Sequence, residues 1–326
     1  MKREVPVEEA IGLRLAHDLT RIIPGEFKGI AFSKGHVVQE EDVPRLLDMG
    51  KRHVYVLELG DDEMHEDDAA VRMANLTAGR GILTTAPHEG KVVFKAEEDG
   101  MLFVDVDKVF AVNMIEDVSL TTRVPFIAVK AGQSVAGVRP IPLTFRVSLM
   151  EEMERTVGNA KLVEVWPYLP QRISIVTTGS EVQSGRVTDA FGPVLREKFA
   201  SFGMSVENQA IVGDEMEDIV GAIQSAVAGG ATLVCVTGGM SVDPDDRSPG
   251  AIRRVADEVV TQGTPMLPGS MMMVAYVGQT VIFGLPGAVI HDKWTAFDVL
   301  LPRALANWRF TKADIARQGA GGWLNA

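Results

Sequence analysis

The chain has 326 residues, of which 46% are hydrophobic and 23% charged, and its formal net charge is -12. This composition is that of an ordinary globular protein long enough for about two domains. The acidic balance argues against nucleic acid as a partner, because a phosphate backbone requires a basic surface. A local pocket of backbone N–H groups could still hold a small anion.

The sequence contains no apolar stretch of the ~18 to 20 residues that a membrane span requires. The N-terminal residues are not followed by the apolar segment of a signal peptide. We therefore expect a cytoplasmic protein with no membrane partner. The single cysteine, Cys235, excludes an internal disulfide framework. It stands in the apolar run Ala231–Val236, which predicts a buried structural thiol rather than a nucleophile.

The first half, residues 1–170, reads as a mixed, β-rich α+β region. Residues 1–58 suggest short strands and turns with one helix at Glu40–Met49, where apolar residues recur at helical spacing. The acidic run Asp61–Asp68 begins a second expected helix that extends to about residue 79. We interpret this run as the solvated first turn of the helix, favoured by its dipole, with metal binding as the alternative.

A β pattern follows from Gly81 to about Ser148. Its expected strands are short, rich in β-branched residues and separated by glycine or charged turns; they include Lys91–Phe94, Leu102–Val104, Val109–Val112 and Phe126–Val129. Pro170 immediately precedes a new strand pattern. We place the domain boundary there, with an α/β domain at residues 171–326.

In this second domain, strands and helices alternate regularly. The expected strands are 173–177, 204–212, 231–237 and 280–283, and the expected helices are 189–202, 215–228, 249–258 and a long one at 286–308. Such repetition predicts βαβ units, a mostly parallel sheet and a three-layer α/β domain. In these folds the ligand lies beyond the carboxyl ends of the strands.

Each expected strand of this domain ends in a loop rich in Gly, Ser, Thr or Asp. The four loops are Thr177–Glu181, Val212–Glu215, Thr237–Asp246 and Gly284–Ala288. Glycines let the backbone approach a ligand, and the helices that follow add the positive ends of their dipoles. One such loop is commonly only a turn with a helix cap. Four of them at one edge of a sheet favour a ligand that carries a phosphate.

Several common motifs are absent. There is no P-loop, no GxGxxG after a strand and no serine nucleophile elbow. The six histidines are scattered and there is one cysteine, so a zinc site is not expected. Carboxylates do gather at the predicted ligand edge: Glu181, Asp214, Asp243, Asp245 and Asp246. They suit Mg²⁺, which takes one or two carboxylates plus phosphate oxygens; the alternative for residues 243–246 is a turn with a cap.

Four motifs then resemble a known family. Thr178–Glu181, Gly185–Asp189, Thr237–Ser241 and Leu285–Gly287 are similar to the molybdenum cofactor biosynthesis domain. That domain occurs in molybdopterin adenylyltransferases, molybdopterin molybdotransferases and gephyrin. In the first half, Leu15–Asp18, Pro24–Gly29 and Lys34–His36 also resemble molybdotransferase relatives. The resemblance suggests a short, divergent molybdotransferase-like protein.

The resemblance implies that molybdopterin, or adenylyl-molybdopterin, binds along the strand ends. It assigns cofactor binding to Thr178, Gly179, Ser180, Asp189, Gly238, Gly239, Met240, Ser241, Pro286 and Gly287. It places Glu181, Asp214 and Asp246 where molybdotransferases carry acidic residues for metal-dependent insertion. We therefore expect these three to be catalytic, and Asp243 with Asp246 to hold Mg²⁺.

The departures from the family concern catalysis. Its TGDE motif reads Thr178–Glu181 with serine in third place, and its lysine-bearing PGKP loop reads Leu267–Met271, without a lysine. The usual C-terminal β-barrel is not expected after the last helix. Molybdate is an oxyanion that requires cationic or N–H donors. The resemblance therefore supports pterin binding more strongly than molybdate insertion.

Three functions remain open from the sequence. The first is a molybdopterin-binding protein in cofactor biosynthesis or maturation, either a carrier or an insertase. The second is an active, Mg²⁺-dependent molybdopterin molybdotransferase, in which another cation such as Lys293 replaces the missing lysines. The third is a nucleotide hydrolase of the competence-damage type. We expect a pterin as ligand, a homo-oligomer, and a molybdoenzyme or another cofactor-pathway protein as partner.

Overall fold

The chain divides into two compact units in the computed structural model, which describes residues 2–23, 27–57, 59–241 and 246–324. The first unit comprises Met1–Pro125 with Val129–Trp166. The second comprises Pro167–Ala326 together with the short segment Phe126–Ala128. Among the described residues, no helix is both long enough and apolar enough to cross a bilayer.

The N-terminal part of the first unit is built from short elements. They are β1 (Lys2–Pro6), η1 (Val7–Ala10), β2 (Leu19–Ile23), β3 (Phe27–Phe32), α1 (Asp42–Asp48) and β4 (His53–Leu57). β1 pairs antiparallel with β4, and β2 pairs antiparallel with β3. A small apolar core that includes Val7, Leu46 and Val56 holds these elements together. The helix expected at Glu40–Met49 is confirmed as α1.

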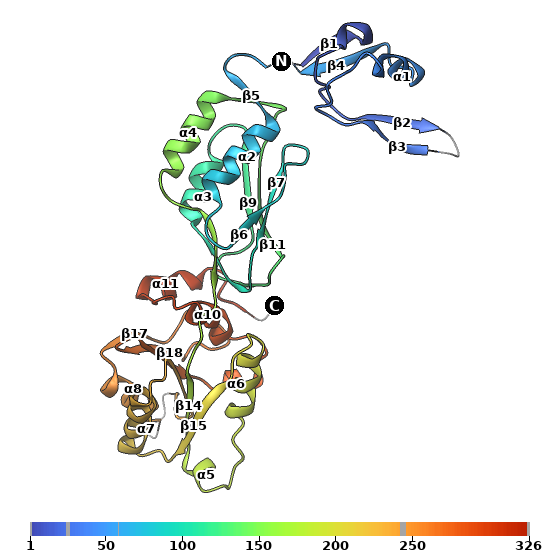
Figure 1. Ribbon diagram of the computed structural model, residues 1–326. Coiled ribbons are helices and arrows are strands. Elements are labelled where there is room, and N and C mark those ends of the chain that lie inside the picture. The colour runs from blue at the N-terminus through green and yellow to red at the C-terminus, as the bar shows by residue number, and fades with distance from the viewer. Residues whose placement is uncertain (1, 24–26, 58, 242–245, 325–326) are drawn as a thin grey trace. The chain divides into compact units, whose positions relative to one another are not determined.

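The rest of the first unit combines short sheets with three helices (Figure 1). The strands are β5 (Glu63–His65), β6 (Ile82–Thr84), β7 (Val92–Ala96), β8 (Gly100–Val104), β9 (Val118–Thr122), β10 (Ala128–Val129), β11 (Ser134–Pro140), β12 (Thr144–Arg146) and β13 (Val163–Pro167). The helices are α2 (Glu66–Thr77), α3 (Val106–Asn113) and α4 (Val147–Val157). Three sheets result, ordered β6-β7-β11-β9, β10-β8-β13 and β12-β5.

One strand expected in this unit is wrong. Val109–Val112 lies inside α3, because Asp105 caps that helix by accepting a hydrogen bond of 3.0 Å from the backbone N–H of Lys108. The β-branched composition of the run suggested a strand, but the local cap favours a helix. The strand expected at Phe126–Val129 is reduced to the two residues of β10.

The second unit contains one six-stranded sheet. Its strands are β14 (Ile173–Thr178), β15 (Val206–Val212), β16 (Leu233–Thr237), β17 (Glu258–Gln262), β18 (Met273–Val277) and β19 (Thr280–Leu285), in the order β15-β14-β16-β19-β18-β17. The first four run parallel, and the last two pair antiparallel. The predicted mostly parallel sheet is confirmed, whereas β17 and β18 were not expected.

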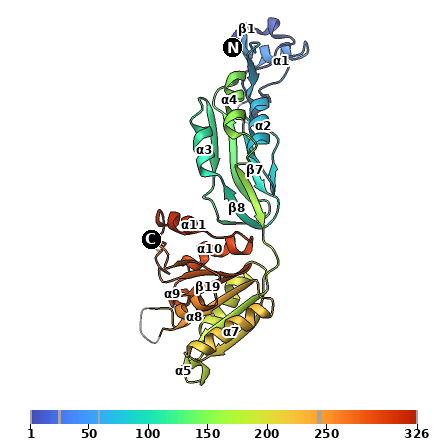
Figure 2. The ribbon, with the colours of Figure 1, turned by 90° about the vertical axis from the view of Figure 1, so that its left-hand side faces the viewer.

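Helices cover both faces of this sheet and give the predicted three layers (Figure 2). One face packs against α7 (Met216–Ala228) and α8 (Ser248–Val255). The other packs against α6 (Phe191–Ala200) and α10 (Ala296–Leu305). The remaining elements are the short helices α5 (Ser180–Gln183), α9 (Ala288–His291), α11 (Lys312–Ala316) and η2 (Arg317–Gly319).

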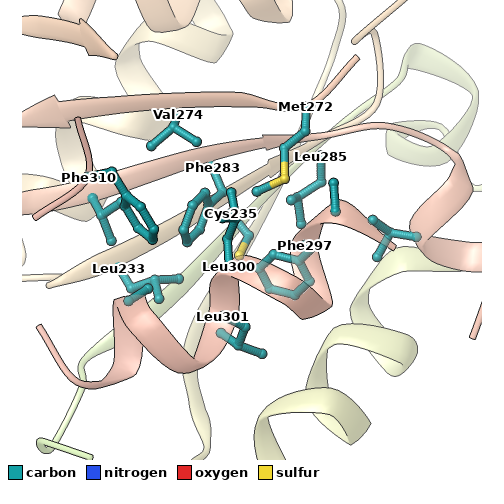
Figure 3. Packing of buried hydrophobic residues seen from close by; sticks show 14 of the residues in the cluster. Leu233, Cys235, Met272, Val274, Phe283, Leu285, Phe297, Leu300, Leu301 and Phe310 are labelled. Carbon is teal, nitrogen blue, oxygen red and sulfur yellow. The ribbon is translucent and has the colours of Figure 1, made fainter. Parts of the chain in front are cut away.

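Cys235 lies in the larger of the two cores, under α10, close to Phe283 and Phe297 (Figure 3). Its side chain is fully buried, and burial raises the pKa of the thiol far above its ordinary value. Deprotonation inside an apolar core would leave an unsolvated charge. The expectation of a buried structural thiol is confirmed.

The single long helix expected at residues 286–308 is wrong. The chain forms α9, leaves helical geometry at Asp292 and starts α10 after Thr295. Thr295 and Asp298 form a reciprocal capping box, which provides partners for the backbone N–H groups at the start of α10. The interruption places Lys293 in a connecting segment rather than on a helix.

Candidate functional site

A cavity of about 500 Å³ lies at the carboxyl ends of β16 and β19. We call it the strand-end pocket. Its lining residues come from the two strand-end loops, the start of α6 and the segment before β18; they are Phe191, Gly238, Gly239, Met240, Ser241, Asp246, Met271, Leu285, Pro286 and Gly287. Parallel strands bring their carboxyl ends to one edge, so loops that are far apart in sequence meet there.

The turn at Gly238 and Gly239 has positive φ angles of 86° and 53°. A side chain at Gly238 would overlap the carbonyl oxygen of Thr178, so only glycine fits there. The hydroxyl of Ser248, at the start of α8, donates a hydrogen bond of 2.7 Å to the carbonyl oxygen of Gly238. It also lies 3.3 Å from Oγ1 of Thr178. The buried hydroxyls of Ser248 and Thr178 therefore help to hold the Gly238–Gly239 turn in place.

Four predicted residues, Gly179, Ser180, Glu181 and Asp214, lie at neighbouring strand ends rather than in the described lining of the pocket. Ser180 begins α5, and its backbone N–H donates a hydrogen bond of 2.8 Å to Oδ2 of Asp214. Glu181 follows on α5, and Gly179 precedes it with a φ of 142°. A Cβ on Gly179 would lie 3.0 Å from Oε1 of Glu181. Asp214 therefore fixes the loop after β14. The carboxylate of Glu181 lies close to Gly179 in the same loop.

Asp189 is also outside the pocket lining. It accepts hydrogen bonds of 3.0 Å from the backbone N–H groups of Phe191 and Gly192. These are the first two residues of α6, so Asp189 satisfies donors that the helix itself leaves free. Because Phe191 lines the pocket, Asp189 positions one of its walls.

Asp246 is the one carboxylate among the described residues that line the strand-end pocket. It makes no hydrogen bond or ion pair with another described residue, and no described side chain caps α8. The adjacent Arg247 is paired with Glu215 at 2.7 Å. Asp243, the other expected metal ligand, lies outside the described residues. Within the described part of the chain, no group of three or more Cys, His, Asp or Glu side chains could hold a metal ion.

The described lining of the strand-end pocket contains no lysine or arginine. Met271 stands in the loop where the family resemblance expects a lysine, and Met240 and Phe191 add further apolar surface. Lys293, the replacement cation considered from the sequence, lines a different cavity. An anion in the strand-end pocket would therefore be held by backbone N–H groups rather than by a side-chain cation.

Sequence reasoning missed two lining residues, Phe191 and Met271, whereas Leu285 belongs to the predicted loop Gly284–Ala288. Phe191 follows Asp189 by two residues, so a local signal for it existed. Met271 reaches the pocket because β18 folds back to pair antiparallel with β19. The pairing itself has no local sequence signal, although the family resemblance had already singled out the loop Leu267–Met271.

Two family models match parts of the chain. Residues 174–306 match the family described as "Probable molybdopterin binding domain". The matched residues lie in the second unit and include the strand-end pocket. Residues 4–58 match another family, described as a domain of unknown function.

Curated relatives act in molybdenum cofactor biosynthesis by their names. A molybdenum cofactor biosynthesis bifunctional protein from Chlorobaculum tepidum is 26% identical over 189 residues, which are 54% of this chain and 58% of that protein. A molybdopterin molybdenumtransferase from Staphylococcus aureus (strain COL) is 28% identical over 122 residues, or 35% and 29% of the two chains. This chain thus spans about three fifths of the length of the first relative and under a third of the second.

Solved structures with similar chains carry related titles. The molybdopterin biosynthesis enzyme MoaB from Thermus thermophilus is 25% identical, with a TM-score of 0.37, and the match covers 43% of this chain and 98% of that one. The molybdopterin biosynthesis Mog protein from Mycobacterium ulcerans is also 25% identical, with a TM-score of 0.37, covering 43% and 99%.

Proposed function

We propose that this protein binds molybdopterin in the strand-end pocket and acts in the biosynthesis or maturation of the molybdenum cofactor. One observation carries the proposal: the Gly238–Gly239 turn and the Pro286–Gly287 loop line one cavity, inside the domain that matches the molybdopterin-binding family. Close backbone approach at both loops suits a phosphate-bearing ligand.

The lining indicates how the two ends of the pterin would be held. The phosphate would contact backbone N–H groups of the Gly238–Ser241 loop, near the start of α8, where the helix dipole is positive. The flat ring would lie against Phe191 and Met271, since aromatic and thioether side chains make favourable contacts with ring systems.

We infer that binding, rather than molybdate insertion, is the principal activity. Molybdate would need cationic or N–H donors beyond those that hold the phosphate, and the described lining supplies no cationic side chain. A carrier that accepts or delivers the pterin needs no second oxyanion position. We therefore propose for this chain only a part of the activity for which its relatives are named.

A second candidate is a Mg²⁺-dependent molybdopterin molybdotransferase acting on adenylyl-molybdopterin. The specific observation in its favour is Asp246, a carboxylate in the lining that is not engaged by another described residue. Mg²⁺ typically takes one or two carboxylates together with substrate phosphate oxygens. In this version Asp246 holds the ion, with Glu181 and Asp214 at neighbouring strand ends as further acidic groups.

The direct test is whether the full-length protein carries a pterin. Protein purified from cells that make the cofactor would be oxidised, and the released pterin measured by fluorescence after chromatography. The decisive variant is Gly287→Leu, because Gly287 lines the pocket, a Cβ added there would meet no atom within 4 Å, and its φ is not positive. The matched control is Gly221→Ala on α7, which is equally free of neighbours and is not among the lining residues.

We expect wild type and Gly221→Ala to carry pterin, and Gly287→Leu to lose about tenfold or more in affinity, a change of about 1.4 kcal/mol. The melting temperature of Gly287→Leu should stay close to that of wild type. Absence of pterin from the wild type, together with no binding on titration, would contradict the proposal. Equal pterin content in Gly287→Leu would place the ligand elsewhere.

The assembly, cellular location and partner of the protein also follow from its proposed role. We propose a homo-oligomer that works in the cytoplasm and passes the pterin to a molybdoenzyme or to another protein of the pathway. Support comes from the family match and from the single buried cysteine, which needs no oxidising compartment. Light scattering at micromolar concentration tests the assembly, and a monomer mass would remove the oligomer from this proposal.

A further inference from the structure

A second cavity, of about 490 Å³, lies between α6, α9 and the start of α10. We call it the helix pocket. It shares no described lining residue with the strand-end pocket. Val194, Phe202, Val289, Ile290 and Trp294 give its walls apolar surface, and the lining also includes the polar or charged residues Glu197, Lys198, Ser201, His291, Asp292, Lys293 and Asp298.

The charged pair in the helix pocket is already satisfied. Lys198 donates hydrogen bonds to Oδ1 of Asp298 at 2.5 Å and to the carbonyl oxygen of Lys293 at 3.2 Å. The other carboxylate oxygen of Asp298 accepts from the backbone N–H and the hydroxyl of Thr295, both at 2.8 Å. The two charged side chains are only 14% and 10% exposed. This pair therefore offers no free charge to an ionic ligand.

The walls, in contrast, offer apolar surface that the fold leaves uncovered. Trp294 lies in the segment between α9 and α10 and is 50% exposed beside the cavity. Phe202, Val194 and Ile290, which are each partly exposed, add apolar surface. An apolar, aromatic cavity of several hundred cubic ångströms with a few polar groups is typical of small-molecule sites. A large aromatic side chain left half exposed there gains contacts when a flat ring stacks on it.

Polar groups at the cavity can recognise the edges of such a ring. Glu197 supplies a hydrogen-bond acceptor, Ser201 a hydroxyl that can accept, and His291 a ring that can donate or accept. A saturated aliphatic ligand would leave these groups unused. A strongly anionic ligand would meet three carboxylates, those of Glu197, Asp292 and Asp298, against only two lysines, Lys293 and the already paired Lys198.

We propose that the helix pocket is a second binding site that takes a planar, uncharged heteroaromatic ring, of purine or pterin type, stacked on Trp294. The site stands on its own residues and does not depend on the ligand of the strand-end pocket. The two pockets are nevertheless neighbours along the chain. Phe191 and Val194 are one turn apart on α6, and Gly287 and Val289 are two residues apart. A ligand with two ring systems could therefore use both.

The test uses the full chain and two phosphate-free probes, adenosine and 6-hydroxymethylpterin, each titrated by calorimetry. We expect at least one of the two probes to bind. Comparing their affinities shows whether the pocket prefers a purine or a pterin ring. Trp294→Ala should weaken that binding about tenfold, the size expected when one stacking contact is lost. Trp294→Phe, which keeps a flat ring, should recover part of it.

The matched control is Trp323→Ala, which removes an exposed tryptophan that lines a different cavity. It should bind the probe as wild type does. Failure of both probes to bind wild type would overturn the proposal, and so would equal affinity in Trp294→Ala. Met271→Glu separates the two sites, because it places a charge in the strand-end pocket only. Loss of probe binding in Met271→Glu would locate the ring in the strand-end pocket and overturn the helix-pocket assignment.

Discussion

The side-chain amide of Gln209 on β15 donates a hydrogen bond of 2.6 Å to Oδ2 of Asp189, the residue that caps α6. The same nitrogen lies 3.0 Å from Oγ1 of Thr177 at the end of β14. Thr237 on β16 donates to that hydroxyl at 3.3 Å. Three adjacent strand ends are thereby tied to the first turn of the helix that supplies Phe191 to the strand-end pocket.

We expect Asp189→Ala to destabilise the second unit by about 1 to 2 kcal/mol, the usual cost of losing a helix cap. Ligand affinity should fall as well, because Phe191 would no longer be fixed. Asp189→Asn keeps an acceptor for the helix and should retain most of the stability. Thermal unfolding and pterin titration of both variants measure this. If Asp189→Ala melts like wild type, the cap does not position the pocket wall.

Gly238→Ala should be costly to folding. The residue has a left-handed φ of 86°, where an L side chain costs about 1 to 2 kcal/mol, and the added Cβ would also overlap the carbonyl oxygen of Thr178. We expect a clear fall in melting temperature together with loss of the ligand. Gly221→Ala should instead raise the melting temperature, since alanine is favoured over glycine inside a helix by up to about 1 kcal/mol.

Asp246→Asn tests for a metal. The substitution removes the charge that would hold Mg²⁺ and leaves in place the backbone groups that would hold the phosphate. We expect pterin binding to persist and any Mg²⁺-dependent cleavage of adenylyl-molybdopterin to disappear. Cleavage is followed by chromatography of the released nucleotide, with Mg²⁺ and molybdate present. If the wild type cleaves adenylyl-molybdopterin and Asp246→Asn cleaves it equally fast, Asp246 is not a metal ligand. If the wild type is itself inactive, the result favours a protein that only carries the pterin.

Cys235 should be inert in the folded protein. Burial raises the pKa of its thiol, so the protonated form persists at pH 8, and the fully buried sulfur is closed to reagents. We expect no reaction with a thiol-specific chromogenic disulfide until denaturant is added, and then one thiol per chain. Rapid labelling of the native protein would mean that the core around Phe283 opens.

Asp42 should contribute a pH-dependent part of the stability of the first unit. Burial raises its pKa, but hydrogen bonds from His36 and from the backbone N–H of Gln39 outweigh burial, so the pKa lies below its ordinary value of 3.8. A carboxyl with a lowered folded pKa stabilises the fold above its unfolded pKa and loses that effect as the pH falls through the folded pKa.

The matching variant is Asp42→Asn. We expect it to melt below wild type at pH 6, by an amount equivalent to about 1.5 to 3 kcal/mol for hydrogen bonds to a charged group. The difference should shrink as the pH falls below 3.8, because the wild-type carboxyl becomes protonated. A difference that stays constant from pH 6 to pH 3 would show that the charge of Asp42 is not involved.

The sequence predicts the parallel part of the second unit well because the signals are local. Each βαβ unit shows its own periodicity, and the glycine loops at residues 238–239 and 286–287 follow buried strands directly. The break before α10 could also have been found, since Thr295 and Asp298 have the spacing of a capping box. No glycine or proline stands at the break, residues 292–295, to mark the end of a helix there.

Other features depend on contacts between distant segments. The pairing of β17, β18 and β19 brings Met271 into the strand-end pocket, and no local pattern indicates this pairing, although the loop Leu267–Met271 was recognised by its family resemblance. The roles of Gln209 and Ser248 also arise from positions of neighbouring strands and loops rather than from their immediate sequence. Sequence motifs therefore indicate the loops of the site more readily than they indicate the residues that hold these loops in place or complete the pocket lining.

The thioether of Met271 makes the wall of the strand-end pocket sensitive to oxidation. Conversion of methionine to its sulfoxide replaces an apolar surface by a polar, chiral one. Met271 is partly exposed in the pocket, whereas Met240 is 5% exposed, so an oxidant would reach Met271 first. Ligand occupancy would then decline with storage in air while the fold persisted, and methionine sulfoxide reductase would restore it.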